Sequence, residues 1–164
     1  MKKTGFTLVE IIIVVASIGL IMTAITGITL SIFKSQNRTQ STNKVVNNGN
    51  FILNELKRDI LNSSSSQITC IDNYSVGMIN LNDGVGTTIN CNTINNNIAS
   101  TSGSLVRNLI SANDTSIICP SNFVSCTTLP SLDVTSVSFN FGVGATTAGV
   151  GVTQYFSINV AVRN

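Results

Sequence analysis

Glu10 is the first residue whose chemistry stands out, because it lies at the start of a long uncharged segment. Residues 11–33 contain no Asp, Glu, Lys or Arg, and about 20 apolar residues suffice to cross a bilayer as a helix. A carboxylate at membrane depth costs roughly 2.5–3.5 kcal/mol on insertion scales, so Glu10 is expected to have a cationic partner. Cleavage between Gly5 and Phe6 would create one, the α-amine of Phe6. Four residues make one helical turn, so this amine and Glu10 would pair within one chain or between neighbouring chains.

The basic residues before this segment predict its orientation. Lys2 and Lys3 keep that end in the cytoplasm by the positive-inside rule, so the rest of the chain is expected to face outward. An ordinary secretory signal peptide is the alternative, but its apolar core is about 7–15 residues long. The apolar run here is longer. A plain signal anchor is the other alternative.

The stretch from Lys2 to Glu10 reads Lys-Lys-Thr-Gly-Phe-Thr-Leu-Val-Glu. Together with the apolar segment, it resembles the N-terminus of the type IV pilin and type II secretion pseudopilin family. The resemblance covers roughly residues 1–33. It implies that a membrane prepilin peptidase cleaves after Gly5 and methylates the amine of Phe6, and that Glu10 aids assembly by facing a neighbour's N-terminus. Many major subunits of the family carry a helix-kinking proline where this chain has Gly27.

The predicted fold class is α+β, a pilin-like ladle in which one long helix packs on an antiparallel β-sheet head. The leader would span residues 1–5, the helix residues 6–62 and the head residues 63–164, with 6–33 as the transmembrane part or filament core. After Phe33 an apolar stripe with helical spacing continues: Val45, Gly49, Ile52, Leu53, Leu56 and Ile60. Asn47, Asn48 and Asn50 are possible points of interruption, and Ser63–Ser66 are expected to end the helix.

The head is predicted to be built from short strands and turns, because short apolar runs alternate there with Asn, Asp, Gly and Ser. The Gly-rich stretch 142–151 is expected to be the loop of a terminal hairpin. The candidate strands are Gln67–Ile71, Ser75–Asn80, Leu105–Ser111, Ser116–Cys119, Val134–Phe141 and Val152–Val162.

An even number of cysteines in an exported domain favours disulfides. Four cysteines allow three pairings, and we favour the two local ones, Cys70 with Cys91 and Cys119 with Cys126. A Cys₄ zinc site is the alternative, but no tight Cys-x-x-Cys knuckle is present. No metal or other cofactor is therefore expected.

Catalysis and nucleic-acid binding are both disfavoured by composition. The chain has no His, and the four aspartates of the head are isolated among turn-forming residues, so no general acid–base pair is indicated. We expect no enzyme and no catalytic residue. From Ser63 onward there are two arginines and four aspartates, too little positive charge for a phosphate-binding surface.

The sequence thus predicts a structural subunit of a type IV filament. The resemblance implies as partners other pilin subunits, the prepilin peptidase, the inner-membrane assembly platform and, before assembly, lipid. The expected location is the cytoplasmic membrane as a single-pass precursor, then an extracellular pilus or periplasmic pseudopilus. A minor, tip-initiating pilin or a type II secretion pseudopilin is the alternative within the family. A membrane-anchored adhesin that never polymerises is the alternative of a different class.

Overall fold

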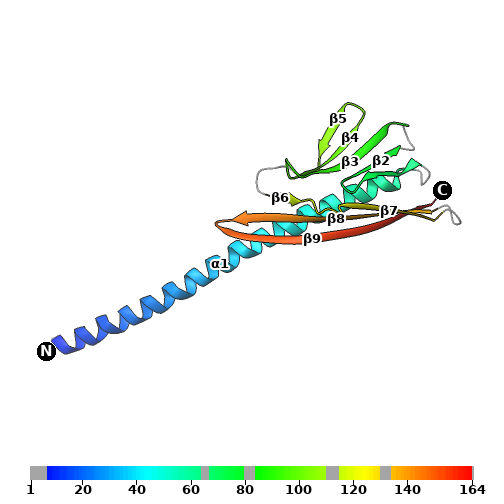
Figure 1. The fold of residues 1–164 in the computed structure, drawn as a ribbon. Helices are drawn as coiled ribbons and strands as arrows, with labels where there is room; N and C mark the ends of the chain where they lie inside the picture. The colour runs from blue at the N-terminus through cyan, green and yellow to red at the C-terminus, as the bar shows by residue number, and fades with distance from the viewer. Residues whose placement is uncertain (1–6, 64–66, 80–83, 110–114, 130–133, 164) are drawn as a thin grey trace.

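In this computed structural model, the described residues form one helix and two antiparallel sheets (Figure 1). The structure describes residues 7–63, 67–79, 84–109, 115–129 and 134–163. Helix α1 (Leu8–Leu61) is 54 residues long, or about 80 Å at 1.5 Å per residue. The predicted α+β class is confirmed.

Helix α1 begins and ends at residues suited to those positions. Thr7 is extended, with φ −79° and ψ 149°, and its side chain accepts a hydrogen bond from the Glu10 amide. The Thr-x-x-Glu spacing from Thr7 to Glu10 is that of a capping box. At the other end the Asn62 amide donates to the carbonyls of Arg58 and Ile60. The asparagines at 47, 48 and 50 do not interrupt the helix, so that expectation was wrong.

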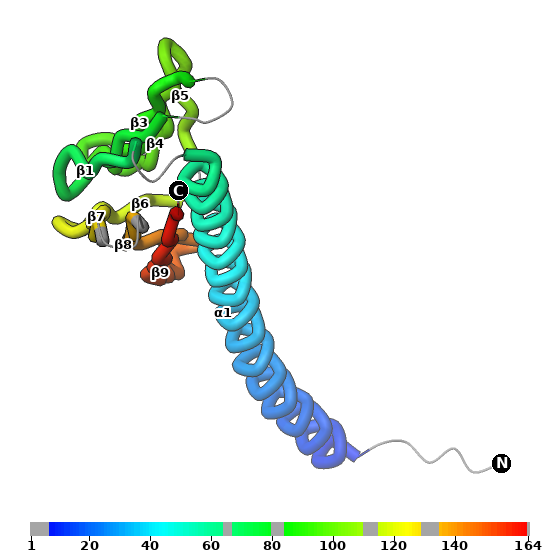
Figure 2. Tube along the Cα trace, turned by 90° about the vertical axis from the view of Figure 1, so that its right-hand side faces the viewer, coloured from blue at the N-terminus to red at the C-terminus, as the bar shows by residue number. Residues whose placement is uncertain are grey.

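The two halves of α1 have different surroundings. The N-terminal half projects away from the sheets, and Figures 1 and 2 show nothing packed beside it. In the C-terminal half one stripe is buried against the head, and it matches the predicted stripe closely. Its members are Ser41, Val45, Gly49, Ile52, Leu56 and Ile60.

The first sheet is a five-stranded antiparallel meander in the order β1-β2-β3-β4-β5. Each strand pairs with the next strand along the chain. The β1–β2, β3–β4 and β4–β5 connections are therefore short turns. The strands are β1 (Thr69–Asp72), β2 (Ser75–Ile79), β3 (Gly86–Asn92), β4 (Asn97–Ser102) and β5 (Leu105–Asn108).

The second sheet is organised around β8 (Val134–Thr147), which has neighbours on both sides. On one side, β9 (Val150–Arg163) pairs with it along its whole length. On the other side, β6 (Thr115–Ile118) pairs with the C-terminal part of β8, and β7 (Val124–Leu129) pairs with its N-terminal part. The β8–β9 turn places Ala148 and Gly149 at positive φ, as a two-residue hairpin turn requires. The predicted terminal hairpin is confirmed.

Both sheets and the helix share one hydrophobic core. Helix α1 packs against β8 and β9, where Phe139 and Phe141 are fully buried. Phe123 adds a tilted contact to Phe139, with ring centroids 5.6 Å apart. The first sheet contributes Val76 and Ile89 to the same core.

Six of the nine strands that the structure describes were predicted, and three were not. Strands β3, β4 and β7 were missed because each has few apolar residues. In β3, for example, the buried face consists of Thr87, Ile89 and Cys91, which is a weak signal in a sequence rich in Asn and Thr. The expected loop 142–151 was too long, since β8 and β9 continue through most of it.

Candidate functional site

The N-terminal half of α1 is an uncovered apolar surface with one carboxylate. Every residue from Leu8 to Phe33 is exposed, and the large apolar side chains among them are half or more exposed. Among the described residues, α1 is the one helix long and apolar enough to cross a membrane. An isolated chain would leave this surface in water, so it must be covered by lipid or by protein. Membrane anchoring or secretion is thereby indicated.

Glu10 lies in the first turn of α1, where its charge faces the positive end of the helix dipole. Its amide donates to the Thr7 side chain over 3.4 Å and to the Thr7 carbonyl over 3.1 Å. The side chain borders a shallow hollow of about 250 Å³, which is otherwise lined by Ile11, Val14 and Val15. The backbone contact between Glu10 and the N-cap Thr7 was not predicted. The residues Gly5 and Phe6, predicted for cleavage and methylation, lie outside the described residues.

All four cysteines form disulfides, as predicted, but the favoured pairing was wrong. The bonds join Cys70 to Cys126 and Cys91 to Cys119. A disulfide requires Cα atoms about 4.4–6.8 Å apart, and the observed separations are 5.9 and 5.8 Å. Cys70 and Cys91 lie on strands separated by β2, which places them roughly 10 Å apart.

The observed bonds join the two sheets to each other. Cys70 in β1 bonds to Cys126 in β7, and Cys91 in β3 bonds to Cys119, which directly follows β6. Sequence spacing alone could not indicate this, because it depends on how the sheets are placed in space. Disulfides in this part of the chain indicate a head outside the cytoplasm.

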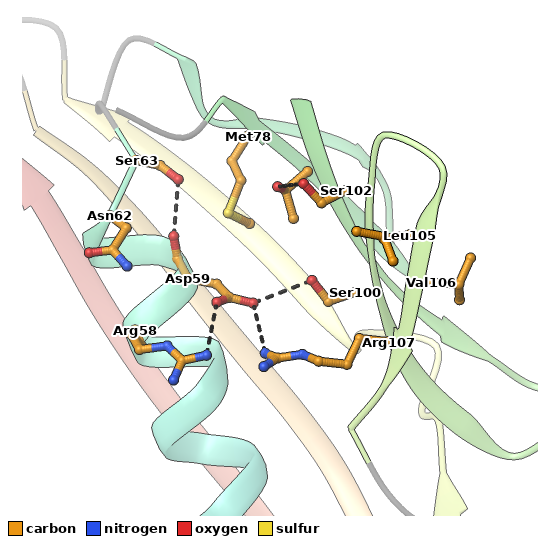
Figure 3. A pocket seen from close by; sticks show the side chains of 11 residues that line it. Arg58, Asp59, Asn62, Ser63, Met78, Ser100, Ser102, Leu105, Val106 and Arg107 are labelled. Atoms are coloured by element: carbon orange, nitrogen blue, oxygen red, sulfur yellow. Dashed lines mark hydrogen bonds and ion pairs between the residues drawn. The ribbon is translucent and has the colours of Figure 1, made fainter. Parts of the chain in front are cut away.

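A cluster of four charged side chains connects the last turns of α1 to the first sheet. Figure 3 shows three of them, Arg58, Asp59 and Arg107. Arg107 of β5 forms an ion pair with Glu55 and lies 3.9 Å from a carboxylate oxygen of Asp59. Arg58 contacts the same two acids, at 2.6 and 3.9 Å. The Ser100 hydroxyl also donates to Asp59, at 3.3 Å. This cluster was not predicted, because Arg107 is far from the helix residues in sequence.

Burial raises the pKa of Asp59 above its ordinary value of 3.8. The Arg107 and Arg58 guanidiniums and the Ser100 hydroxyl act against this rise, whereas the Glu55 carboxylate adds to it. Both arginines remain about half exposed, and Asp59 is 17 % exposed. Exposed ion pairs of this kind contribute about 0–1 kcal/mol, so the cluster orients β5 against the helix more than it stabilises the head.

The pKa of Asp72, at the β1–β2 turn, is shifted in the opposite direction. One carboxylate oxygen accepts hydrogen bonds from the Tyr74 amide, at 2.7 Å, and from the Ser75 hydroxyl, at 2.8 Å. These bonds favour the charged form and lower the pKa of Asp72 below 3.8. The residue is therefore an ordinary turn aspartate, which agrees with the prediction that isolated aspartates here are turn residues.

The charged cluster borders a groove of about 480 Å³ between the end of α1 and the β4–β5 hairpin. Hydroxyls of Ser100, Ser102 and Thr87 line it together with the apolar side chains of Leu105 and Val106. Its two arginines face Asp59 of the groove wall and the neighbouring Glu55, so it has no excess positive charge for an anion. Among the described residues no group of three His, Cys, Asp or Glu is placed to hold a metal ion.

Comparison with known proteins returned no match: no family model, no curated protein and no solved structure matches the chain.

Proposed function

We propose that the chain is a structural subunit of a type IV filament, processed after Gly5, methylated at Phe6 and polymerised through the N-terminal half of α1. The observation that carries the proposal is the uncovered apolar half of α1. It is continuous with a packed half in one 54-residue helix, and it has a single acidic residue near its beginning.

The same surface suits two environments in turn. Before assembly, lipid would cover the exposed apolar side chains, with the disulfide-bonded head outside the cytoplasm. After assembly, the equivalent helices of neighbouring subunits would cover them. An apolar surface exchanges lipid for protein at little cost because both are apolar. Exposure of all residues between Leu8 and Phe33 is what such an exchange requires.

The pattern Lys-Lys-Thr-Gly-Phe-Thr-Leu-Val-Glu supports the processing step. Removal of residues 1–5 would delete both lysines of the leader and leave the Phe6 amine as the cation nearest to Glu10 in sequence. We propose that this amine, on one subunit, pairs with Glu10 of a neighbour. The prepilin peptidase and an inner-membrane assembly platform are the partners that this pathway needs.

Mass spectrometry of sheared surface filaments tests the proposal. The expected result is this chain with an intact mass that begins at a monomethylated Phe6. Its abundance relative to other subunits would distinguish a major from a minor pilin. A chain that retains residues 1–5 and stays in the membrane fraction would contradict the proposal and favour a membrane-anchored adhesin that does not polymerise.

A further inference from the structure

The face of the second sheet that points away from α1 is polar and almost free of charge. Successive residues of a strand face opposite sides, and in β9 Phe156, Val160 and Val162 face the helix side. The alternate residues of β9 and their partners on β8 make up the outer face. From 153 to 161 these are Thr153, Tyr155, Ser157, Asn159 and Ala161, paired with Gly144, Gly142, Asn140, Ser138 and Ser136.

Tyr155 is the one large apolar side chain of β9 on this face, and 69 % of it is exposed. Its position is fixed by Gly142, directly opposite on β8. A Cβ atom on Gly142 would lie 3.1 Å from Cε1 of Tyr155 and 3.1 Å from Cβ of Ile118, which is paired with Gly142 from the other side. The absent side chain lets the Tyr155 ring lie against the β8 backbone while most of the ring stays open to solvent.

Polar groups without charge surround this ring. A shallow depression of about 330 Å³ is lined by Tyr155 and by Pro120, Asn122, Asn140, Phe141, Phe156 and Ser157. The Asn140 side-chain amide donates to the Asn122 carbonyl over 3.2 Å, and the Asn140 backbone amide donates to the Phe123 carbonyl over 2.8 Å. These bonds attach the loop before β7 to the sheet and orient one amide at the edge of the depression.

We propose that this depression, the Tyr155 site, binds one sugar ring of a neutral oligosaccharide. An exposed aromatic ring offers a flat apolar face to the C–H face of a sugar, and asparagine and serine side chains both donate and accept hydrogen bonds, as sugar hydroxyls do. Ligand sites commonly combine an apolar wall with a few placed polar groups. In the part of the chain that the structure describes, no charged side chain lines the depression, which argues against nucleotides and acidic sugars.

The site is independent of the polymerisation surface. It lies on the sheet face opposite α1, so in the proposed filament it would point away from the axis; only this step rests on the proposed function. Sugar binding by the full-length chain in detergent does not require filaments. Failure to bind sugar and failure to polymerise are therefore separate results.

Tyrosine fluorescence can report on the site directly, because the chain contains two Tyr and no Trp. In Tyr74→Phe, Tyr155 is the single tyrosine. This variant, in a zwitterionic detergent without a sugar headgroup, would be titrated with chitotetraose, cellotetraose and maltotetraose, and with sialyllactose as a charged comparison. We expect at least one neutral tetrasaccharide to change the Tyr155 emission saturably, and sialyllactose to bind more weakly.

Substitutions assign the binding to the ring, measured by calorimetry with the responding sugar. Tyr155→Ala should weaken binding by about tenfold or more, and Tyr155→Phe should weaken it by much less because the ring is kept. Gly142→Ala keeps Tyr155 but crowds its ring, and should also weaken binding. Ile94→Ala removes an exposed side chain of the β3–β4 turn that does not line the depression, and it should change nothing.

Three outcomes would overturn the proposal. One is the absence of a response to all three neutral sugars. Another is unchanged affinity in Tyr155→Ala. The last is a Tyr155 emission that changes with protein concentration and not with added sugar. That result would assign this face to contact between subunits.

Discussion

At the scale of single residues, Glu10 combines two physical roles that a single substitution would confuse. It is the third helical residue after the N-cap Thr7 and completes the capping-box sequence. It is also the acid proposed to pair with a neighbour's Phe6 amine. The observed cap bond runs from the Glu10 backbone amide to Thr7, so a substitution at Glu10 removes only the bond that the Glu10 side chain would return to the Thr7 amide in a capping box. Loss of the charge removes the proposed contact between subunits.

Two variants of Glu10 separate these roles. Glu10→Gln keeps a side chain able to close the capping box but has no charge, whereas Glu10→Leu loses both. If the charge registers the subunits, both variants should insert in the membrane and be cleaved normally, yet reach surface filaments at a small fraction of the wild-type yield. Filament yield divided by membrane-pool abundance is the measurement. A normal ratio for Glu10→Gln would show that the charge of Glu10 is not needed for assembly.

Asp59 should make the stability of the head depend on pH. Its pKa is raised in the folded protein, so the folded state holds the proton more tightly than the unfolded state does. The resulting stabilisation is complete below the unfolded value of 3.8 and is lost as the pH rises through the folded pKa. Asp59→Asn cannot titrate, so the stability of wild type minus that of the variant should fall as the pH rises above 3.8 and through the raised folded pKa.

Denaturant unfolding of the detergent-solubilised chain at several pH values measures this difference. Asp72→Asn provides the matched comparison. The pKa of Asp72 is lowered, so its contribution is present above 3.8 and is lost only as the pH falls through its folded pKa. The difference between wild type and Asp72→Asn should therefore be flat over the range in which Asp59→Asn changes. A flat difference for both variants would contradict the assignment.

At the scale of secondary structure, the contact between α1 and β9 depends on a missing side chain at Gly49. A Cβ atom there would lie 2.1 Å from Cζ of Phe156, whose ring is stacked on Phe141 with centroids 5.7 Å apart. The aromatic ring therefore rests against the helix backbone. Glycine weakens a helix by about 1 kcal/mol relative to alanine, and here that cost allows the sheet to approach closely.

Gly49→Ala should destabilise the head by about 1–3 kcal/mol despite the better helix propensity, because overpacking costs more than the propensity returns. The free energy of unfolding in detergent is the measurement. Adding Phe156→Leu should recover part of the loss, since the flexible side chain can move aside, and the double-mutant cycle gives the coupling. Gly27→Ala makes the same change where nothing lies within 4 Å and should leave the head unchanged. A stabilised Gly49→Ala would show that the contact is loose.

The sequence predicted these elements unevenly, for physical reasons. The long helix was predictable because its apolar residues follow one period from Val45 to Ile60. Apolar and polar residues alternate strongly enough in β8 and β9 for the strands to be predicted. Their glycines, however, led to the prediction of a loop where the strands continue. Gly142 and Gly144 lie within β8 because side chains of neighbouring strands occupy the space beside them. A sequence shows that a side chain is absent, and only the fold shows what fills the space.

At the scale of the whole molecule, the two disulfides hold together sheets that otherwise share few strand contacts. The main strand contacts between the sheets are β1 with β7 and β4 with β6. The outer bond joins β1 to β7, and the inner bond runs from β3, the neighbour of β4, to the residue after β6. The sequence separations are 56 residues for the outer bond and 28 for the inner bond. Loops of these lengths correspond to about 4 kcal/mol each in the chain-entropy description. The disulfides are thus a large part of what keeps the first sheet in place.

Non-reducing peptide mapping should find the pairs Cys70–Cys126 and Cys91–Cys119. Replacing one native pair by alanine should lower the free energy of unfolding by about 2–4 kcal/mol. Cys70→Ala with Cys126→Ala leaves the inner bond intact and should still fold. Cys70→Ala with Cys91→Ala leaves Cys119 and Cys126, which should remain as free thiols. A bond between these two would support the local pairing that the spacing had suggested.

The nested arrangement of the two bonds also determines how the head would bear a pulling force. The outer bond connects β1 directly to β7, so tension entering through α1 and leaving through β9 bypasses the residues between Cys70 and Cys126. At about 3.4 Å per extended residue, the 56-residue separation withholds roughly 190 Å of chain from extension. Stretched between its ends, an oxidised subunit would yield by separating α1 from the second sheet, and it would stop lengthening far short of its contour length. In a reduced subunit the first sheet could unfold and extend under the same force. The redox state of the cysteines would therefore determine how far a subunit lengthens under load.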